Sequence, residues 1–423
     1  MKILLVGGGG REHAIAWKLA QSPLCTKLFC APGNAGIARV AELVPIAAAD
    51  VDAIALWAAR NGMDFVVVAS DDPLALGLVD KCKAAGLRAF GPSQAAAELE
   101  WSKVFSKGLM KKYNIPTAEY EMFTDCESSV KYAKLQHPSA QKPVVIKADG
   151  LALGKGVIIA RSADEAEDAI RDMMEGGRFA ASGRRVVVEE FLRGREVTVL
   201  CFTDGETVVP MPASRDHKRA FDGDLGPNTG GMGVITPVAD YTPEFAARCM
   251  DEIFLPTVRA MKAEGRPFAG VLYFELMLTP DGPKVIEYNA RFGDPEAQAI
   301  LPLLESDLLD IMLAVEDGNL RRVTPVWTDA ACACVVMASG GYPGDYPKGL
   351  PIAGIESLSE DMLLFHAGTA RDTEGRLVTA GGRVLALCAT GNAPKEALER
   401  VYGQIDKVTF NGAFYRRDIG KST

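Results

Sequence analysis

The sequence of 423 residues contains no apolar run long enough for a membrane-spanning helix, which needs about 18 or more apolar residues. It also lacks an excess of positive charge, because 46 Lys and Arg face 55 Asp and Glu, a formal net charge of −9. Broad nucleic-acid binding requires a basic surface. We therefore expect neither a membrane nor a nucleic-acid partner, and the first residues do not read as a secretory signal.

Cysteine and histidine patterns that bind metal are missing as well. The nine cysteines are scattered without a CxxC pair, and the four histidines lack the spacing of a zinc site. Cys332 and Cys334 stand two apart in a strand-like run, so their side chains should share one face. The pattern predicts reduced, mostly buried thiols in a cytoplasmic protein.

Glycine is abundant, with 42 residues, and the sequence shows no internal repeat or low-complexity segment. Hydrophobic residues make up 48% and charged residues 24%, which is typical of globular proteins. At about 150 residues per domain, the length indicates roughly three domains. Three segments are especially rich in glycine, namely residues 7–10, 150–156 and 223–233.

Alternating strands and helices predict an open, mostly parallel α/β sheet in residues 1–102. We expect strands at residues 2–6, 28–30 and 64–69, and helices at residues 11–21, 52–61 and 72–85. Ser93 is a candidate cap for the next helix.

Residues 103–322 predict a second domain built from hairpins, and residues 323–423 a third of α+β type. The expected hairpins pair residues 144–148 with 156–160, 186–192 with 196–203, and 270–278 with 284–289. A long glycine-rich loop covers residues 222–233, and a helix over residues 243–264 should end at Gly265. In the third domain we expect strands at residues 331–339 and 383–390 and a helix at residues 394–402.

The first glycine cluster, GGGGREH at residues 7–13, follows a strand and opens a helix. Such glycines let a backbone approach a phosphate at a helix N-terminus. The dinucleotide fingerprint requires a third glycine where this sequence has Glu12, and no acid follows the second strand. This argues against a nicotinamide site, and leaves open a loop for phosphate or a small substrate, or only a tight turn.

The second cluster, KADGLALGKGV at residues 147–157, joins two strands. It is not a Walker A motif, because the spacing is one residue short and Gly156 replaces the Ser or Thr. A glycine loop between antiparallel strands can cover nucleotide phosphates, with Lys147 and Lys155 as charge partners. The alternative is a glycine-rich hairpin with solvated lysines.

A carboxylate hairpin follows at residues 270–289. If it is centred on Asp281, Glu275 stands opposite Glu287, and Asn289 shares the face of Glu287. Opposed like charges destabilise a sheet, and a divalent cation between them removes that penalty. Oxygen ligands alone suit Mg²⁺ or Mn²⁺, while an exposed edge hairpin is the alternative. Arg291, just beyond, could grip a carboxylate or phosphate with both arms of its fork.

Taken together, these segments resemble the ATP-grasp superfamily. The stretches GGGGREHA (7–14), APGNAG (31–36), KADGLALGKGV (147–157), SRDHKRAFDGDLGPNTGGMG (214–233) and EYNARFGDPE (287–296) resemble its glycinamide ribonucleotide synthetase family from end to end. The resemblance implies a Rossmann-like (preATP-grasp) domain at 1–102, an ATP-grasp domain at 103–322 with a small mobile lid about residues 118–192, and a C-terminal α+β domain at 323–423. It implies a cytoplasmic monomer in purine biosynthesis.

The resemblance also implies roles for individual residues. Lys103 and Lys147 would contact the ATP phosphates under the loop that carries Gly150, Gly154, Lys155 and Gly156. The adenine pocket would comprise Glu189, Glu190, Phe191 and Leu192, with Glu196 on the ribose. Magnesium or manganese would bind Glu275, Glu287 and Asn289. Glycine and phosphoribosylamine would lie among Asp216, Lys218, Asn228, Gly230, Arg291 and Asp294, with Gly9, Gly10 and Asn34 on the phosphoribosyl group. Arg291, Lys147 and Asp216 would be catalytic.

The implied reaction joins glycine to 5-phosphoribosylamine through glycyl phosphate, giving glycinamide ribonucleotide, ADP and phosphate. Positioning, charge neutralisation and exclusion of water would carry it, without a protein nucleophile. Carboxylation with bicarbonate and nucleotide binding without turnover are the alternatives, with a nicotinamide oxidoreductase more distant.

Overall fold

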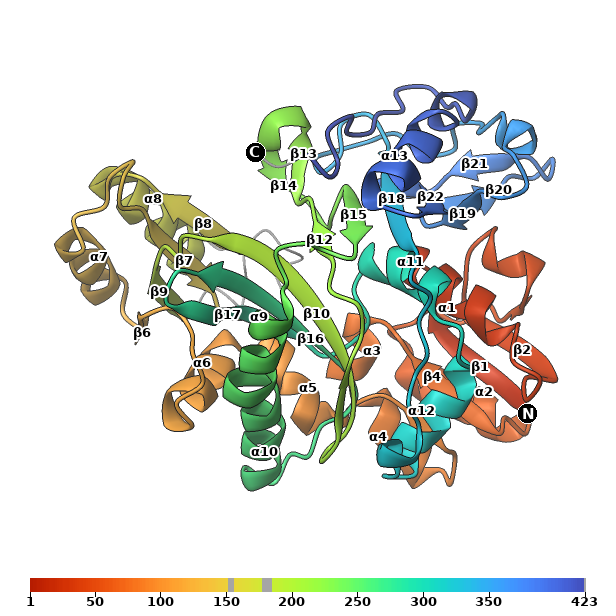
Figure 1. Cartoon of the computed structure of the whole chain (residues 1–423), viewed down its shortest axis with the longest axis horizontal. Coiled ribbons are helices and arrows are strands. Elements are labelled where there is room, and N and C mark those ends of the chain that lie inside the picture. The colour runs from red at the N-terminus through yellow and green to blue at the C-terminus, as the bar shows by residue number, and fades with distance from the viewer. Residues whose placement is uncertain (151–155, 177–184, 422–423) are drawn as a thin grey trace.

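The computed structural model describes residues 1–150, 156–176 and 185–421. Its first unit is a five-stranded parallel sheet in the order β3-β2-β1-β4-β5, at the right of Figure 1. The strands are β1 (Lys2–Gly7), β2 (Lys27–Pro32), β3 (Glu42–Leu43), β4 (Phe65–Val68) and β5 (Ala89–Phe90). The helices are α1 (Gly10–Leu19), α2 (Val51–Arg60), α3 (Asp71–Ala75), α4 (Leu78–Ala84) and α5 (Gln94–Trp101). The parallel α/β sheet is confirmed.

One predicted helix of this unit is wrong. The helix expected over residues 72–85 is interrupted at Gly77, whose φ of +77° lies in the left-handed region that helices do not use. Ser93 does cap α5, since its side chain accepts a hydrogen bond from Ala96 N at 3.2 Å.

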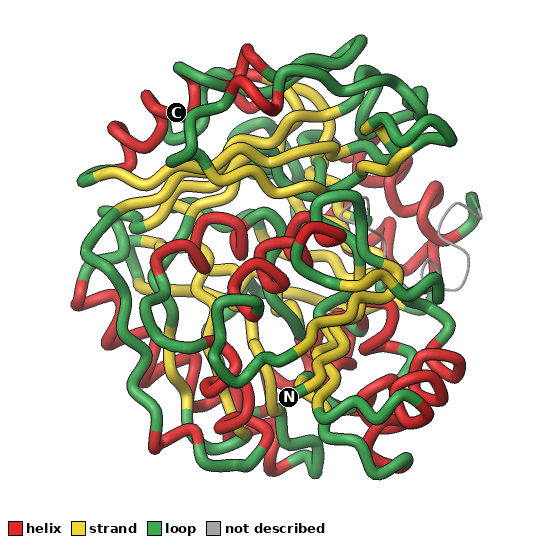
Figure 2. Tube along the Cα trace, turned by 90° about the vertical axis from the view of Figure 1, so that its right-hand side faces the viewer, coloured by secondary structure: helices red, strands yellow, loops and turns green. Residues whose placement is uncertain are grey.

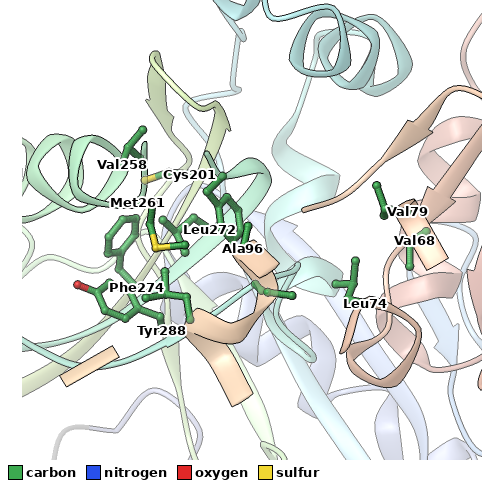
Figure 3. Close-up of a cluster of buried hydrophobic side chains, with 14 of the residues drawn as sticks. Val68, Leu74, Val79, Ala96, Cys201, Val258, Met261, Leu272, Phe274 and Tyr288 are labelled. Atoms are coloured by element: carbon green, nitrogen blue, oxygen red, sulfur yellow. The ribbon is translucent and has the colours of Figure 1, made fainter. Parts of the chain in front are cut away.

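Strand β1 lies between two cores, so both of its faces are apolar. Leu4 and Val6 pack in one cluster with α2, α4, β10 and β16, and Ile3 and Leu5 pack in another with α1, α12 and β18. Period-two alternation thus sends neighbouring residues of one strand into different cores. Figure 3 shows part of the first cluster, in which Leu272, Phe274 and Met261 pack together.

A small antiparallel sheet in the order β6-β9-β7-β8 lies at the left of Figure 1. Its elements are β6 (Tyr120–Phe123), α7 (Cys126–Leu135), β7 (Val144–Ala148), β8 (Val157–Ala160), α8 (Ala163–Met174) and β9 (Val186–Glu190), and α6 (Lys103–Lys112) precedes it. The β7–β8 hairpin was predicted correctly. The hairpin of residues 186–192 with 196–203 is wrong, because β9 pairs with β6 and β7 while the next strand belongs to another sheet.

That other sheet has the order β11-β10-β16-β17 and is antiparallel. It comprises β10 (Arg195–Asp204), β11 (Val208–Pro210), β16 (Ala269–Thr279) and β17 (Gly282–Asn289). The helix expected over residues 243–264 is observed as α9 (Pro243–Cys249), a π-helical turn (Met250–Phe254) and α10 (Leu255–Ala263). Gly265 follows the helix with φ +72°, as a C-terminal glycine should.

A third antiparallel sheet, β12-β15-β18-β22-β19, joins the middle of the chain to its end. Figure 2 shows strands crossing the upper part of the molecule. The remaining elements are β12 (Arg215–Asp216), β13 (Arg219–Phe221), β14 (Leu225–Asn228), β15 (Gly233–Thr236), α11 (Glu296–Ile300), α12 (Leu308–Glu316), β18 (Ala331–Ala338), β19 (Leu363–His366), β20 (Thr369–Arg371), β21 (Leu377–Thr379), β22 (Arg383–Gly391) and α13 (Pro394–Tyr402).

Two predictions concern this sheet and the loop beside it. Cys332 and Cys334 do share one face, since both enter the core beneath β1 while Ala333 and Val335 enter the core beside α13. The loop expected over residues 222–233 is less irregular than predicted, because part of it pairs as β14 with β13. Within the described ranges, no helix is long and apolar enough to cross a membrane.

A buried polar cluster links α1 to β19. The backbone N–H of His366 donates to His13 Nδ1 at 2.7 Å, and the Asn34 side chain donates to the carbonyl of His366 at 2.8 Å. Burial first, then the neighbouring His366 ring and Arg39, lowers the pKa of His13 to about 3. Burial, then Arg39, lowers the pKa of His366 to about 4. Both rings are therefore neutral in the fold.

This cluster predicts acid sensitivity. Below the usual histidine pKa of 6.5, the unfolded chain takes up protons that the folded cluster refuses, so stability falls as the pH drops from 6.5 toward about 3. His13→Gln keeps an acceptor for His366 N–H and removes one titrating ring. We expect its unfolding free energy, measured in urea at about pH 7.5 and about pH 5, to vary less with pH than that of the wild type.

His137→Gln is the matched control, because His137 lies outside the cluster and both buried rings remain in that variant. Equal pH dependence in His13→Gln and wild type would contradict the proposed protonation states.

Candidate active site

A cleft of about 960 Å³ lies where the sheets meet. The N-terminal unit contributes Arg11 and Asp71, the β10–β17 sheet contributes Glu275 and Glu287, and the C-terminal unit contributes Arg383. The crossing from β9 to β10 also borders it. The chain leaves one sheet and enters another at this point, which places the connecting backbone in the wall of the cleft.

The structure gathers most of the predicted site residues along this cleft. Those that line it are Lys103, Lys147, Gly150, Gly156, Glu189, Glu190, Phe191, Leu192, Glu196, Asp216, Lys218, Asn228, Gly230, Glu275, Glu287, Asn289, Arg291 and Asp294. Gly154 and Lys155 fall outside the described residues. Gly9, Gly10 and Asn34 are described but do not line the cleft.

Glu275 and Glu287 are paired across the β16–β17 hairpin, as predicted. The register arises differently from the expectation of a hairpin centred on Asp281. A turn sets Thr279 opposite Gly282, and this register would put Glu275 opposite Ile286. A β-bulge between the pairs Leu276–Val285 and Glu275–Glu287 leaves Ile286 as the extra residue and brings the two glutamates face to face. The Ile286 carbonyl accepts a hydrogen bond from Lys147 Nζ at 3.2 Å.

The two glutamates are buried among lysines. Lys218 donates to Glu275 Oε1. Burial raises the pKa of Glu275 to about 7, against the attraction of Lys218 and with the repulsion of Glu287. Burial also works to raise the pKa of Glu287, but Lys103, Lys218 and Lys147 outweigh it and lower that pKa to about 2. Glu275 is therefore the member of the pair that takes up a proton first, and three ammonium groups surround the pair.

A second carboxylate, Glu189, lies between two buried lysines. Its Oε2 is 3.0 Å from Lys147 Nζ and 3.1 Å from Lys107 Nζ. Lys103 on α6 and Lys147 on β7 line the cleft and supply a concentrated positive charge beside the glutamates, whereas Lys107, also on α6, does not line it. Such a cluster suits a polyphosphate.

Arg291 is enclosed by acidic groups. Its Nε donates to Asp71, its Nη2 lies 3.0 Å from Glu100 Oε1 and donates to Asn289 Oδ1 at 3.1 Å, and its Nη1 donates to the Phe292 carbonyl at 3.2 Å. Burial works to raise the pKa of Asp71, but Arg291 and Arg11 lower it to about 2. The planar fork thus holds four acceptors at one edge of the cleft.

Asp216 and Glu296 form a second pair of buried carboxylates. Burial first, then repulsion from Glu296, raises the pKa of Asp216 far above its usual range. Burial also raises the pKa of Glu296, whose Oε1 accepts a hydrogen bond from the Tyr273 hydroxyl at 2.9 Å. Two carboxylates that resist ionisation side by side would accept a bound cation.

The first glycine cluster sits at the carboxyl end of β1, next to Asp294. Gly8 has no room for a side chain, because a Cβ there would lie 2.6 Å from the Gly33 carbonyl oxygen. Gly9 N donates to Glu12 Oε2 at 2.6 Å. The Asn34 amide spans the loop, donating to Gly8 O at 2.9 Å and accepting from Gly36 N at 2.9 Å. Asn34 therefore braces the loop from behind.

Several residues of the cleft were not predicted from the sequence. Arg11, Asp71 and Glu100 come from the N-terminal unit, Tyr273 and Glu296 from the middle, and Tyr342, Tyr346 and Arg383 from the C-terminal unit. Asp71 was detectable, because it follows β4, whose carboxyl end lies beside that of β1 at the point where the strand order reverses. Arg383 carried no such signal. It reaches the cleft through tertiary contacts, donating to the carbonyls of Gly230 at 2.7 Å and Asp294 at 2.6 Å.

No group of three His, Cys, Asp or Glu side chains suited to a metal occurs among the described residues. The predicted set contains two glutamates and an asparagine. Its chemistry nevertheless fits a hard cation, because the donors are all oxygens and two of them are opposed carboxylates, of which Glu275 is buried and Glu287 half-buried. The Asn289 carbonyl accepts from Arg291 and keeps a second lone pair.

Three family models cover most of the chain. They are described as phosphoribosylglycinamide synthetase N domain (residues 1–100), ATP-grasp (A) domain (101–297) and C domain (332–422). The chain is 49% identical over 423 residues to phosphoribosylamine–glycine ligase of Caulobacter vibrioides, covering 99% of this chain and 98% of the relative. The counterpart from Halalkalibacterium halodurans is 48% identical, with 99% and 96% covered.

A solved structure agrees with these matches. The crystal structure of phosphoribosylamine–glycine ligase from Thermotoga maritima superposes with a TM-score of 0.86 at 35% identity, covering 99% of this chain and 100% of that one.

The enclosure of Arg291 predicts that Arg291→Lys is not conservative. A lysine cannot meet Asp71, Glu100 and the two carbonyl acceptors at once, so buried acceptors lose their donor. We expect the unfolding free energy in urea to fall by about 2 kcal/mol. Arg88→Lys is the matched control, because Arg88 also contacts two carboxylates but its side chain is 40% exposed.

Arg88→Lys should lower the unfolding free energy by less than about 1 kcal/mol. Equal losses for the two variants would show that the Arg291 fork contributes no more than a surface ion pair.

Proposed function

The chain belongs to the phosphoribosylglycinamide synthetase family, and we propose that its cleft ligates glycine to 5-phosphoribosylamine with ATP, forming glycinamide ribonucleotide, ADP and phosphate. The reaction is a step of purine biosynthesis and makes the protein an ADP-forming carbon–nitrogen ligase. The observation that carries this proposal is the cleft itself. One cleft is lined by lysines for a polyphosphate, by oxygen donors for a divalent cation and by a pair of carboxylates for an ammonium group.

ATP lies between the two central sheets in this proposal. Lys103 and Lys147 contact its phosphates, since both line the cleft beside Glu287 and lower the pKa of that group. The crossing that contains Phe191 and Leu192 offers backbone and side-chain edges to adenine, and Glu196 at the start of β10 faces the ribose.

Glu275, Glu287 and Asn289 would hold magnesium or manganese. Bound there, the ion would neutralise phosphate charge and orient the phosphates for transfer. Lys103, Lys147 and Lys218, which surround Glu287, would also neutralise phosphate charge, because ammonium groups stabilise charge on the oxygens of a transferring phosphoryl group.

Glycine presents its ammonium to Asp216 and Glu296. These buried carboxylates repel each other, and the ammonium supplies the missing cation. Held at that end, the glycine carboxylate is directed toward Arg291 and the phosphate lysines. Positioning of this kind contributes more than any single charge to such a reaction.

Two displacements complete the reaction. A carboxylate oxygen of glycine attacks the γ-phosphorus of ATP, the bond to the β–γ bridging oxygen breaks, and ADP leaves. The amine of phosphoribosylamine then attacks the carbonyl carbon of glycyl phosphate, loses a proton and expels inorganic phosphate. Water would destroy the acyl phosphate, so enclosure by three domains serves the chemistry.

Phosphoribosylamine enters from the side of the N-terminal and C-terminal units. Lys218, Asn228 and Gly230 line that end of the cleft, with Asp294 beside the glycine loop of residues 7–10. Gly9 caps α1 and Gly10 begins it, so in this proposal their backbone faces the phosphate of phosphoribosylamine. Asn34 supports the loop through its hydrogen bond to the Gly8 carbonyl.

Product analysis tests the function. With ATP, glycine, Mg²⁺ and freshly prepared phosphoribosylamine, we expect ADP and phosphate in equal amounts, released only when glycine is present. AMP as a product, or equal release with bicarbonate in place of glycine, would contradict it. Tight ATP binding without turnover would favour a nucleotide-binding protein instead.

Glu287→Ala should abolish this turnover while the fold is retained, because it removes the ionised member of the carboxylate pair from the cation site. Circular dichroism checks the fold, and phosphate release at saturating Mg²⁺ checks the activity. Glu360→Ala, at an exposed glutamate, is the control and should leave the rate unchanged. A Glu287→Ala rate comparable to wild type would refute the cation assignment.

A further inference from the structure

Lys107 is a buried lysine to which the proposed reaction gives no task. It lies one turn after Lys103 on α6, and its side chain is 3% exposed. Lys107 is not among the described residues that border the cleft. Lysines are almost never fully buried unless they are paired, so this position demands a reason.

The contacts of Lys107 are specific. Its Nζ lies 3.1 Å from Glu189 Oε2, donates to Thr117 Oγ1 at 2.8 Å, and stands 5.3 Å from the centroid of the Tyr120 ring. The Tyr120 hydroxyl in turn donates to the Lys107 carbonyl at 2.7 Å. A carboxylate, a hydroxyl and a ring face thus fix the ammonium from three sides.

Glu189 receives two ammonium groups on one oxygen. Lys147 Nζ lies 3.0 Å from the same Oε2 atom, whereas the buried Oε1 has no hydrogen-bond partner among the described residues. One lysine would suffice to neutralise Glu189. Lys147 also faces Glu287 and Glu275, whereas Glu189 is the only carboxylate within ion-pair distance of Lys107 among the described residues. A further anion beside Lys147 would therefore draw Lys147, and not Lys107, away from Glu189.

The proposed function supplies that anion. Lys147 is the lysine that lines the cleft and contacts the phosphates, so it must turn part of its charge toward ATP. Without Lys107, Glu189 would then be a buried carboxylate with no cation beside it, which is strongly unfavourable. Lys107 does not line the cleft, and its ammonium is held by Glu189 and Thr117, so it stays with Glu189.

We propose that Lys107 is a positioning residue for nucleotide recognition, which holds Glu189 by Oε2 when Lys147 is drawn to the phosphates and so keeps Oε1 fixed as a free acceptor. This inference rests on the proposed function, because it takes ATP as the ligand of the cleft. A fixed acceptor suits the exocyclic amino group of adenine, a donor, and rejects the carbonyl that guanine carries at the same place. Lys107 thus contributes to ATP selectivity through Glu189.

Lys107→Met tests this inference, because methionine is similar in length and carries no charge. Binding of ATP and of GTP is measured by calorimetry with Mg²⁺ and without glycine, and steady-state kinetics follow. We expect ATP binding to weaken about tenfold or more, the preference for ATP over GTP to fall, and KM for glycine to stay within about twofold. Lys111→Met is the control, since Lys111 is exposed on the same helix and also lies near the Tyr120 ring, at 5.7 Å.

A double-mutant cycle separates positioning from a general structural effect. Glu189→Gln alone should lower the ATP preference, and adding Lys107→Met to it should lower the preference little further, because Lys107 acts through Glu189. Additive losses would overturn the inference, as would unchanged ATP and GTP binding in folded Lys107→Met. If Lys107→Met does not fold, Lys107→Arg decides, since it retains the charge but not the single-atom contact and should still weaken ATP binding relative to GTP.

The two proposals fail separately. A wild type that binds ATP but shows no glycine-dependent turnover contradicts the ligase function and leaves the binding test of Lys107 in force. A wild type that ligates glycine while Lys107→Met keeps its ATP selectivity contradicts the role of Lys107 alone.

Discussion

Buried like charge is the constraint on which this structure depends. Glu275 faces Glu287 across a hairpin, and Asp216 lies close enough to Glu296 for the two carboxylates to repel each other, and all four line one cleft. The protein tolerates these pairs by surrounding them with lysines and by keeping some carboxyl groups protonated. Each pair remains short of a cation, and the proposed ligands of the cleft, a divalent ion and an ammonium, carry the charge that each lacks. Binding therefore relieves an electrostatic cost that folding has already incurred.

The arrangement of the domains follows from shared apolar cores and brings these charged groups together. Strand β1 packs one face against the central sheet and the other against the C-terminal sheet, so the three units share cores. The carboxyl end of the parallel sheet, the bulged hairpin and the β12–β22 sheet consequently meet at one place. Two arginines connect the units at this place. Arg383 donates to the carbonyls of Gly230 and Asp294, and Arg291 contacts the carboxylates of Asp71 and Glu100. A reactive acyl phosphate formed there would be shielded on every side.

Local patterns predicted much of this fold, and long-range pairing explains most of the errors. Alternation and glycine placement were enough for the parallel sheet, the β7–β8 hairpin and the end of the helix before Gly265. They could not show that β9 and β10 separate into different sheets, since a strand's partner depends on distant segments. The opposition of Glu275 and Glu287 was predicted from an assumed register, and the bulge that produces it left no mark in the sequence. Tertiary contacts alone place the Asn34 side chain behind the glycine loop and Lys107 beside Glu189, so local patterns could not predict either position.

The central claim is that glycine's carboxylate attacks ATP inside this cleft, and the fate of its oxygen tests that claim most directly. Glycine labelled with oxygen-18 in the carboxylate is supplied with ATP, Mg²⁺ and phosphoribosylamine, and the released phosphate is examined by mass spectrometry. Attack through glycyl phosphate transfers one labelled oxygen to each phosphate, because the bond that breaks in the second step is the acyl carbon–oxygen bond. Phosphate without label would mean that the phosphoryl group passed to water or to another acceptor, and would contradict the account.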